Sequence, residues 1–382
     1  MPVQQFNFPT RVRFGEEAIQ ELGQALKDQG VKRPLIVTDK ALAQLEIIER
    51  IVGIANKAGA KPKVFSNFQG NPVESQVSEG VREFKGHDSD SIILVGGGAA
   101  LDMGKAIALM AHHPGKLFDY EDEKPGARPV DQPIPFMVAI PTTAGTGSEI
   151  GRSTVISDDK THAKKIMFSP RLLPPLVIAD PELTYGLPPH VTAATGLDAL
   201  THCLEAYLAK GWHPICDGIA LEGVKLIAKH LEQAVIQPKH KEARRHMLVA
   251  SMMGGAAFQK GLGVNHSCAH ALSTVYDMHH GLANGMMLDA CMAFNHEAVP
   301  EKFAVLATAV GIREADDRKA AQGFLTWLRG FRTALGLPSG LKKVDIKITD
   351  QLLDVAFGDV CHGSNPRPVT RDDFRRLYEA AL

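Results

Sequence analysis

The sequence lacks the features that mark several broad classes of protein. It has no apolar run of about 18 residues, the length that a membrane-spanning helix needs. Its 42 Lys and Arg residues balance 43 Asp and Glu residues, whereas a nucleic-acid binder typically shows a basic surface and a high pI. The opening MPVQQFNFPTRVRFG also lacks the basic-then-apolar layout of a secretory signal. We therefore expect neither a membrane nor a nucleic acid as a partner.

Cysteine is scarce and irregularly placed. The five cysteines are Cys203, Cys216, Cys268, Cys291 and Cys361, so all of them lie in the second half of the chain. Their number is odd and no CxxC pair occurs, which argues against a disulfide framework or a zinc ribbon. Reduced cysteines are typical of a reducing compartment, and the sequence therefore predicts a cytoplasmic protein.

The chain is long enough to bury a large core, and its first half has the pattern of a parallel sheet. With 382 residues and a hydrophobic share of 45%, it predicts about two domains. Short apolar runs bounded by Gly, Pro or Asp alternate with helical patterns such as Glu16–Gln29 and Val73–Lys85, as in βαβ units. The expected strands are Pro34–Thr38, Lys63–Ser66, Ser91–Val95, Phe136–Ile140 and Leu176–Ile178.

The second half has helical spacing with little strand signal. The expected helices are Thr192–Ala209, Pro214–Gln233, Glu242–Gln259, Ala304–Val310 and Asp316–Leu335. The prolines of Leu187–Pro189 make a plausible junction, because proline resists the continuation of a regular element. The sequence therefore predicts an α/β domain over residues 1–187, Rossmann-like and dinucleotide-binding, and an all-helical domain over residues 188–382.

Two turns at strand ends have the composition of a phosphate or nucleotide site. Gly96, Gly97 and Gly98 follow one expected strand and precede an apolar helix, whose first N–H groups could face a phosphate. A second turn, PTTAGTGSE, follows the strand at Phe136–Ile140 and offers hydroxyl groups. The alternatives are a tight turn without a ligand and a cluster of helix N-caps. The glycine pattern differs from G-x-G-x-x-G, so an ordinary Rossmann fingerprint is absent.

Asp39 directly follows the strand at Pro34–Thr38. A carboxylate there can accept hydrogen bonds from a ribose diol and would repel a 2′-phosphate, which favours NAD over NADP. An ordinary turn or cap aspartate is the equal alternative.

Three of the 16 histidines belong to two pairs of residues with helical spacing. Asp198 and His202 are four residues apart, as are His266 and His270, so each pair shares one helix face. His280 follows in a His-His-Gly turn. Carboxylate and imidazole ligands suit Zn²⁺ or Fe²⁺, whereas histidines hydrogen-bonded inside a core are the alternative. A dinucleotide half followed by such a metal half indicates metal-assisted hydride transfer.

The motifs resemble those of the iron-containing (group III) alcohol dehydrogenases over nearly all of the chain. The matching segments are VGGGAALDMGK, PTTAGTGSE, DPELTYGLPP, TAATGLDALTHCLEAY, GLGVNHSCAHAL, HHGLANGMML and NPRP at Asn365–Pro368. Their order and spacing agree with the family as well. The resemblance implies a homodimer or larger homo-oligomer that oxidises an alcohol, expected to be primary, to an aldehyde with NAD.

The resemblance also implies the roles of individual residues. The divalent metal, Fe²⁺ by family expectation with Zn²⁺ as a second fit, would be held by Asp198, His202, His266 and His280. His270 would lie at the substrate and could relay the alcohol proton. The matched dinucleotide-binding residues are Asp39, Asn71, Gly97, Gly98, Ala99, Asp102, Thr142, Thr143, Thr146, Lys164 and Leu183.

Three positions depart from the family pattern. Ala99 stands where a serine is usual, so one hydroxyl donor is missing. His279 replaces the proline that often precedes the last metal histidine, and it could compete as a ligand or shape the substrate pocket. Arg152 could favour an anionic or polar substrate, although a structural ion pair is the preferred interpretation.

Two other classes of function stay open at this point. An NAD- and metal-dependent cyclase resembling dehydroquinate synthase would share the fold but show no net redox change, and its metal set differs from the pattern with three histidines. A non-catalytic assembly protein of the same fold would not need an intact set of ligand positions.

Overall fold

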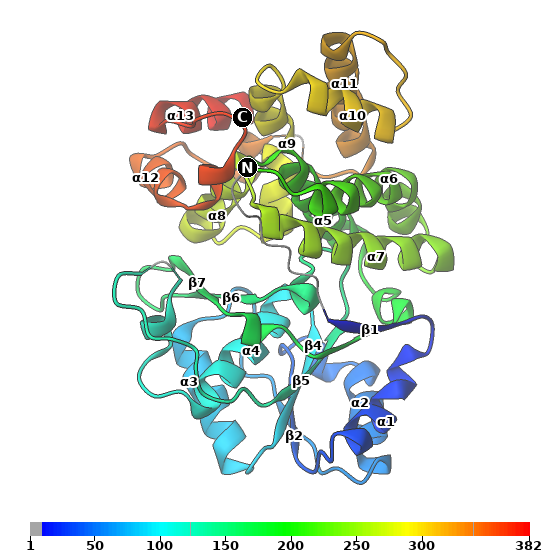
Figure 1. Ribbon diagram of the computed structural model, residues 1–382, viewed down its shortest axis with the longest axis vertical. Helices are drawn as coiled ribbons and strands as arrows, with labels where there is room; N and C mark the ends of the chain where they lie inside the picture. The colour runs from blue at the N-terminus through cyan, green and yellow to red at the C-terminus, as the bar shows by residue number, and fades with distance from the viewer. Residues whose placement is uncertain (1–9, 123, 339) are drawn as a thin grey trace. The chain divides into compact units, whose positions relative to one another are not determined.

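The computed structural model describes residues 10–122, 124–338 and 340–382, which divide into two compact units (Figure 1). Residues 10–143 and 148–185 form the sheet unit, and residues 144–147 and 186–382 form the helical unit. In the described part of the chain the strands all belong to the sheet unit. The predicted fold class, α/β followed by all-α, is therefore confirmed.

Six parallel strands form the main sheet, in the order β1-β8-β5-β4-β2-β3. Their bounds are Arg11–Phe14 for β1, Pro34–Val37 for β2, Lys63–Phe65 for β3, Ser91–Gly96 for β4, Phe136–Pro141 for β5 and Leu176–Ala179 for β8. After β3 the chain crosses back past β2 to form β4, and β5 then pairs with the other side of β4. The carboxyl ends of β2, β4 and β5 therefore lie next to one another along one edge. This edge carries the turns that the sequence singled out.

All five expected strands are present, and three further strands escaped prediction. β1 (RVRF) is a charged edge strand in which Arg11 is exposed and Arg13 is half-buried. β6 (Ser153–Ser157) and β7 (Lys164–Phe168) form a separate antiparallel pair. These strands bury only part of their surface, so they lack the continuous apolar run that marks a central parallel strand.

Helices cover both faces of the sheet because successive strand residues point to opposite sides. Ile36, Ile93 and Ile140 belong to one core cluster with α1 (Glu21–Asp28) and α2 (Glu46–Lys57). α3 (Glu74–Gly86) packs on α4 (Gly98–His112). Leu94 points to the other side, where a Cβ at Gly104 of α4 would lie 2.7 Å from its side chain.

The helical unit is built around α5, which is buried from Thr192 to Leu208. α6, α7 and α9 pack directly against it. The bounds are Pro189–Leu208 for α5, Pro214–Ile236 for α6, Lys241–Ala257 for α7, Val264–Tyr276 for α8, His280–Asn295 for α9, Pro300–Ala309 for α10, Asp317–Ala334 for α11, Asp350–Gly358 for α12 and Arg371–Ala380 for α13. All five cysteines of the chain lie in this unit, free and buried.

Candidate metal and dinucleotide sites

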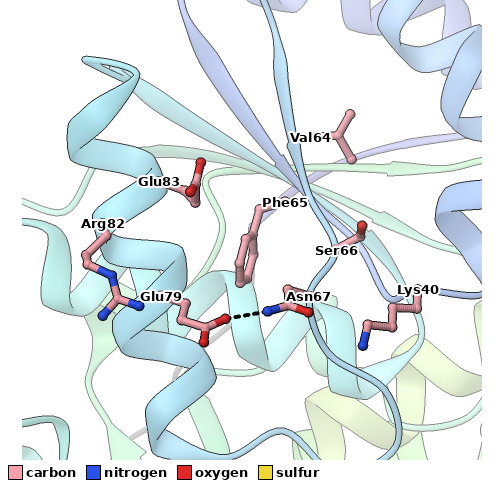
Figure 2. Close-up of a pocket in the computed structure, with 8 residues that line it drawn as sticks. All are labelled: Lys40, Val64, Phe65, Ser66, Asn67, Glu79, Arg82 and Glu83. Carbon is pink, nitrogen blue, oxygen red and sulfur yellow. Dashed lines mark hydrogen bonds between the residues drawn. The ribbon is translucent and has the colours of Figure 1, made fainter.

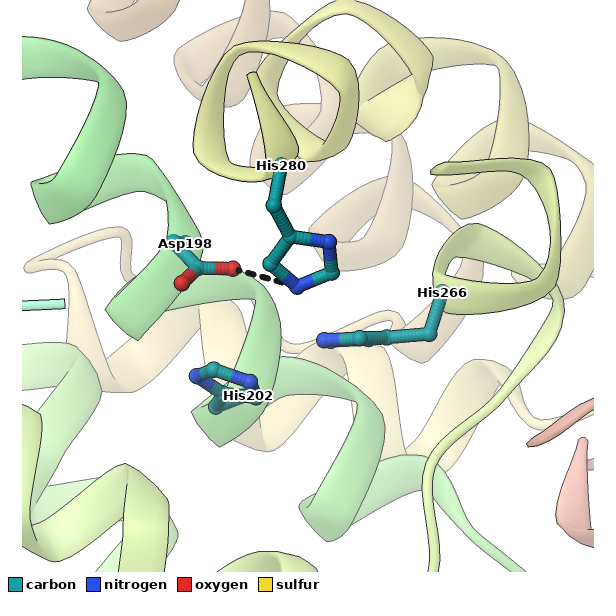
Figure 3. Close-up of side chains that lie close together, drawn as sticks. All are labelled: Asp198, His202, His266 and His280. Atoms are coloured by element: carbon teal, nitrogen blue, oxygen red, sulfur yellow. Dashed lines mark ion pairs between the residues drawn. The ribbon is translucent and has the colours of Figure 1, made fainter. Parts of the chain in front are cut away.

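Four side chains from three helices converge inside the helical unit (Figure 3). Asp198 and His202 lie on one face of α5 because they are four residues apart, His266 lies in the first turn of α8, and His280 is the first residue of α9. Their ligand atoms all lie within 4.8 Å of one another. The structure thus brings together the four residues that the sequence predicted as metal ligands.

Two contacts hold this cluster at short range. His280 Nε2 lies 3.4 Å from Asp198 Oδ1, and the imidazole rings of His202 and His266 stack with their centroids 4.7 Å apart. The start of α9 can approach α5 because residue 281 is glycine: a Cβ there would lie 2.6 Å from the carbonyl oxygen of Ala194. A larger residue at position 281 would push His280 away from its neighbours.

The protonation of the cluster suits a cation. Burial lowers the pKa of His202 to about 4, although the charge of Asp198 opposes this shift, so the imidazole is neutral at pH 7. His266 Nδ1 lies 2.5 Å from Glu205 Oε2, so Nδ1 carries the hydrogen and Nε2 keeps a lone pair. Imidazole nitrogens beside a buried carboxylate are ligands for Fe²⁺ or Zn²⁺, and the residues present therefore fit a divalent metal.

His270 lies beside this cluster and is bound to a second carboxylate. Its ring stacks on that of His280 with centroids 5.2 Å apart, and its Nδ1 lies 2.8 Å from Asp359 Oδ2. Burial raises the pKa of Asp359, but the attraction of His270 and the hydrogen bonds from Ser267 and Cys361 outweigh it, so the pKa stays well below its ordinary value. Asp359 is therefore an acceptor that holds Nδ1 of His270, which leaves Nε2 for a proton partner.

In the sheet unit, the glycine turn forms the predicted transition from strand to helix. β4 ends at Gly96 and α4 begins at Gly98, with Gly97 as its N-cap. A Cβ at Gly97 would lie 3.2 Å from the Oγ1 and Cγ2 atoms of Thr143, so a larger residue there would crowd the close approach of the two turns. The first turn of α4, including Ala99, has no acidic residue to neutralise the positive end of the helix dipole. This arrangement fits a phosphate group.

The contacts of Asp39 show the capping role and are compatible with the ligand-binding role that the sequence left open. Its Oδ1 accepts hydrogen bonds of 2.9 Å from the N–H groups of Ala41 and Leu42, so it caps the turn after β2. Its Oδ2 faces the glycine turn, at 4.0 Å from where a Cβ of Gly96 would lie. A single carboxylate can therefore hold the turn and still present one oxygen to a ligand.

The remaining residues predicted to bind the dinucleotide lie in several environments. Thr142 is buried beside the glycine turn, where its N–H donates to the carbonyl of Gly96 at 3.0 Å. Thr146 belongs to the helical unit instead. Asn71 follows the left-handed Gly70, and Leu183 packs against the apolar core of the sheet unit.

Asp102 on α4 has both carboxylate oxygens engaged within the protein. Oδ1 accepts from Ser148 Oγ at 2.6 Å and Oδ2 accepts from the N–H of Val155 at 3.0 Å. Loss of hydration raises the pKa of Asp102, and the charges of Lys105 and Lys164 oppose that shift. The structure thus gives Asp102 the task of holding β6 on α4.

The two unusual positions have structural contacts. His279 is the N-cap of α9, where its Nδ1 accepts from the N–H of Leu282 at 3.4 Å, and it is not a member of the four-residue cluster. The guanidinium of Arg152 lies over the ring of Phe168, 5.0 Å from the ring centroid. This cation–π contact favours the structural interpretation of Arg152.

A cavity of about 450 Å³ lies beside β3 in the sheet unit (Figure 2). It is lined by Lys40, Val64, Phe65, Ser66, Asn67, Glu79, Arg82 and Glu83. Asn67 Nδ2 donates to Glu79 Oε2 at 2.5 Å across it. None of these eight residues is a predicted dinucleotide ligand, and their charges are of both signs.

Sequence reasoning missed the polar residues that surround the cluster. Glu205 lies seven residues after Asp198 on the same helix face, and Asn284 lies four residues after His280, so helical spacing could have identified both. Asp359 lies 89 residues from its partner His270, and no local pattern connects them.

Comparisons with known proteins agree with this architecture. A family model described as iron-containing alcohol dehydrogenase matches residues 9–181, and a model of the C-terminal part of the Fe-containing alcohol dehydrogenase family matches residues 192–382. The NAD-dependent methanol dehydrogenase of Bacillus methanolicus is 37% identical, with 99% of each chain covered, and the 1,3-propanediol dehydrogenase of Klebsiella pneumoniae is 35% identical, with 97% of this chain and 96% of that one covered. A crystal structure of a 1,3-propanediol oxidoreductase superposes with a TM-score of 0.95 at 34% identity, covering 99% of this chain and 100% of that one.

In the described part of the chain, no helix has the length and apolarity to cross a bilayer.

Proposed function

The chain belongs to the iron-containing alcohol dehydrogenase family, and we propose that it transfers hydride reversibly between a primary alcohol and NAD, giving an aldehyde. The membership confirms the resemblance that the sequence motifs predicted. The alternative of a cyclase resembling dehydroquinate synthase is not favoured, because the matching models and the named relatives are alcohol dehydrogenases.

The observation that carries the proposal is the convergence of Asp198, His202, His266 and His280 within 4.8 Å. In the proposal these residues hold Fe²⁺, or Zn²⁺ in its place, which supplies a Lewis acid for the substrate oxygen. Asp198 contributes the negative charge of the ligand set. The neutral ring of His202 contributes a lone pair, as does Nε2 of His266.

His270 is proposed as the group that moves the alcohol proton. Asp359 holds its Nδ1, which orients the ring and leaves Nε2 to exchange a proton with the substrate hydroxyl or with solvent. The stacking of His270 on His280 keeps this ring next to the proposed ligand set.

NAD is the proposed hydride acceptor, bound by the turns of the sheet unit. The backbone N–H groups of Gly97, Gly98 and Ala99 would bind its phosphates, so the missing serine hydroxyl at position 99 is not essential. Asp39 Oδ2 would accept from a ribose hydroxyl and disfavour NADP. Asn71, Asp102, Thr142, Thr143, Thr146, Lys164 and Leu183 complete the proposed set, with Asp102 acting through the β6 segment that it holds.

The substrate is proposed to be a small primary alcohol. Two relatives are named for methanol and 1,3-propanediol, which are both primary alcohols. We also propose that the protein is cytoplasmic, because its five cysteines are free, and that it is a homodimer or larger homo-oligomer. The boundary between a dinucleotide-binding domain and a metal-binding domain is proposed to lie near Leu187.

The decisive experiment assays a panel of alcohols and aldehydes with NAD(H) and NADP(H), using protein loaded with Fe²⁺ or Zn²⁺. We expect NADH to form in amounts equal to the aldehyde, with a small primary alcohol as the best substrate. Turnover without net NADH formation, or no turnover with any alcohol, would contradict the proposal.

A further inference from the structure

Three polar side chains are buried directly behind the ligand cluster. They are Glu205 on α5, Asn265 on α8 and Asn284 on α9, and they are exposed by 2%, 0% and 0%. Burying a carboxylate or an amide is costly unless its hydrogen bonds are satisfied. The partners of these groups therefore show what each group holds in place.

Glu205 binds both the backbone and the ring of the segment that carries His266. Its Oε1 accepts from the N–H of Asn265 at 2.7 Å, and its Oε2 accepts from the N–H of His266 at 3.3 Å and from His266 Nδ1 at 2.5 Å. The carboxylate thus fixes both the position of the ring and the tautomer in which Nε2 carries the lone pair, and the amide nitrogen of Asn284 lies 3.4 Å from that Nε2.

Asn284 is oriented by Asn265 and turns its amide nitrogen toward the ligands. Asn265 Nδ2 donates to Asn284 Oδ1 at 2.9 Å, which identifies Oδ1 as the acceptor end. Asn284 Nδ2 then donates to Asp198 Oδ1 at 2.6 Å and lies 3.2 Å from His280 Nε2. One oxygen of Asp198 is therefore engaged by the protein itself.

We propose that Glu205 and Asn284 are positioning residues that set the affinity and the coordination of the metal site. Glu205 presents Nε2 of His266. Asn284 donates to Oδ1 of Asp198, which weakens that oxygen as a ligand and leaves Oδ2 as the stronger donor to a cation. The inference rests on the proposed function, since it concerns the same site.

Charge supports the same assignment. Asp198 and Glu205 bring two carboxylates to one buried site, and their formal charges together match that of one divalent cation. Without the charge of Glu205 the loaded site would keep a net positive charge, and burying an unbalanced charge is unfavourable.

The first test is the isosteric substitution Glu205→Gln. The N–H of Asn265 needs an oxygen acceptor, so the new amide nitrogen would face His266 Nδ1 and favour the tautomer whose Nε2 carries a hydrogen. We expect Zn²⁺ affinity, measured on the apoprotein by competition with a chromophoric chelator, to fall by about 10- to 100-fold. The matched control is Glu222→Gln, which removes an exposed carboxylate of α6 that pairs with Lys225, and its affinity should equal that of the wild type.

This titration separates the two possible failures. If the wild-type chain itself binds no stoichiometric Zn²⁺, the proposed function fails together with the inference. If the wild type binds one ion and the folded Glu205→Gln protein binds it equally well, the proposed function stands and the inference is overturned. Circular dichroism of each apoprotein shows which variants are folded.

The second test uses Asn284→Ala and a spectroscopic signature that a purely structural role would not change. Without Asn284, both oxygens of Asp198 are free, so the visible d–d absorption of bound Co²⁺ should weaken as the coordination number rises. Asn295→Ala is the control, because Asn295 is a buried amide that pairs with Asn365 instead of the ligands. An unchanged Co²⁺ spectrum in the Asn284→Ala protein would overturn the inference even if Glu205→Gln failed to fold.

Discussion

Each unit buries a cluster of ionisable side chains, and the two clusters differ in one respect. In the sheet unit, the ammonium group of Lys105 is fully buried and lies 2.5–3.0 Å from four oxygens of Ser148, Gly151 and Ser153. Asp102 and Glu149 lie beside it as counter-charges. In the helical unit, the carboxylate of Asp198 meets three imidazoles, and its ion pair in the described part of the chain is with His280.

This difference distinguishes a structural cluster from a binding site. The ammonium group of Lys105 is itself the cation of the sheet unit's cluster. The oxygens that it contacts belong to the segment that leads into β6, so the cluster fastens that segment to α4. The helical unit's cluster offers electron-pair donors at one point, which is the electrostatic requirement of a metal site. The contrast can be tested by substitutions in each cluster.

Asp198→Ala should abolish the metal site while leaving the sheet unit intact. Loss of the only carboxylate among the four proposed ligands removes the charge that balances a divalent ion. We expect little metal after purification, measured by inductively coupled plasma mass spectrometry, and a fall in kcat/KM of roughly 10³-fold, since a Lewis acid contributes several kcal/mol. Full metal content together with full activity would refute the assignment of Asp198, and the same holds for His266→Ala.

Lys105→Met should have the opposite profile. Removing the buried ammonium leaves four oxygens without their donor and Asp102 without a counter-charge, so the free energy of unfolding should fall by about 3–5 kcal/mol. Metal content should stay unchanged in the folded protein. Lys225→Met, at an exposed position on α6, should change stability by less than about 0.5 kcal/mol. Loss of metal in the Lys105→Met protein would show that the two clusters are not independent.

Glu149 gives the sheet unit a pH dependence opposite in sign to that of Asp359 in the helical unit, whose pKa lies below its ordinary value. Burial raises its pKa from 4.5 to about 7, and its Oε1 has no hydrogen-bond partner among the described residues. Because the folded-state pKa is raised, its contribution to stability is complete below pH 4.5 and is lost as the pH rises through 7. This loss amounts to at most about 3 kcal/mol.

Glu149→Gln should remove that loss. Between pH 4.5 and 7.5 the free energy of unfolding, measured in urea, should fall less for the variant than for the wild type. The pKa of Lys105 is lowered only to about 8, so its titration lies above this range. Glu49→Gln, at an exposed position on α2, should follow the wild type at every pH. Parallel curves for Glu149→Gln and the wild type would contradict the assignment.

The same contrast explains how much could be predicted from the sequence. Buried strands such as β4 and β5 are continuous apolar runs, and helical spacing identified Asp198 with His202 and His266 with His270. These signals are local. The engagement of Asp102 by Ser148 and Val155, and of His270 by Asp359, joins residues 46 to 89 positions apart, so it depends on packing that no short pattern encodes.

Glu205 and Asn284 are a different kind of omission, because their signal was present. Both follow a proposed ligand at helical spacing, but the prediction included only the residues that would bind the metal directly. A buried amide or carboxylate on the ligand face of a helix is as informative as the ligand itself, since imidazole ligands usually donate their second N–H to such a group.

Asp359→Asn should have the smallest effect and tests the proposed proton relay next to the metal cluster. The amide keeps the volume of the side chain but lacks the negative charge of the carboxylate that accepts from His270 Nδ1. The ring of His270 would therefore be held less firmly. We expect kcat to fall about tenfold with little change in metal content or in KM. Asp354→Asn is the matched control, since Asp354 pairs with Arg371 at the surface of the same unit. A lower metal content with unchanged kcat per metal would instead place Asp359 with Glu205 and Asn284, among the residues that shape the ligand set.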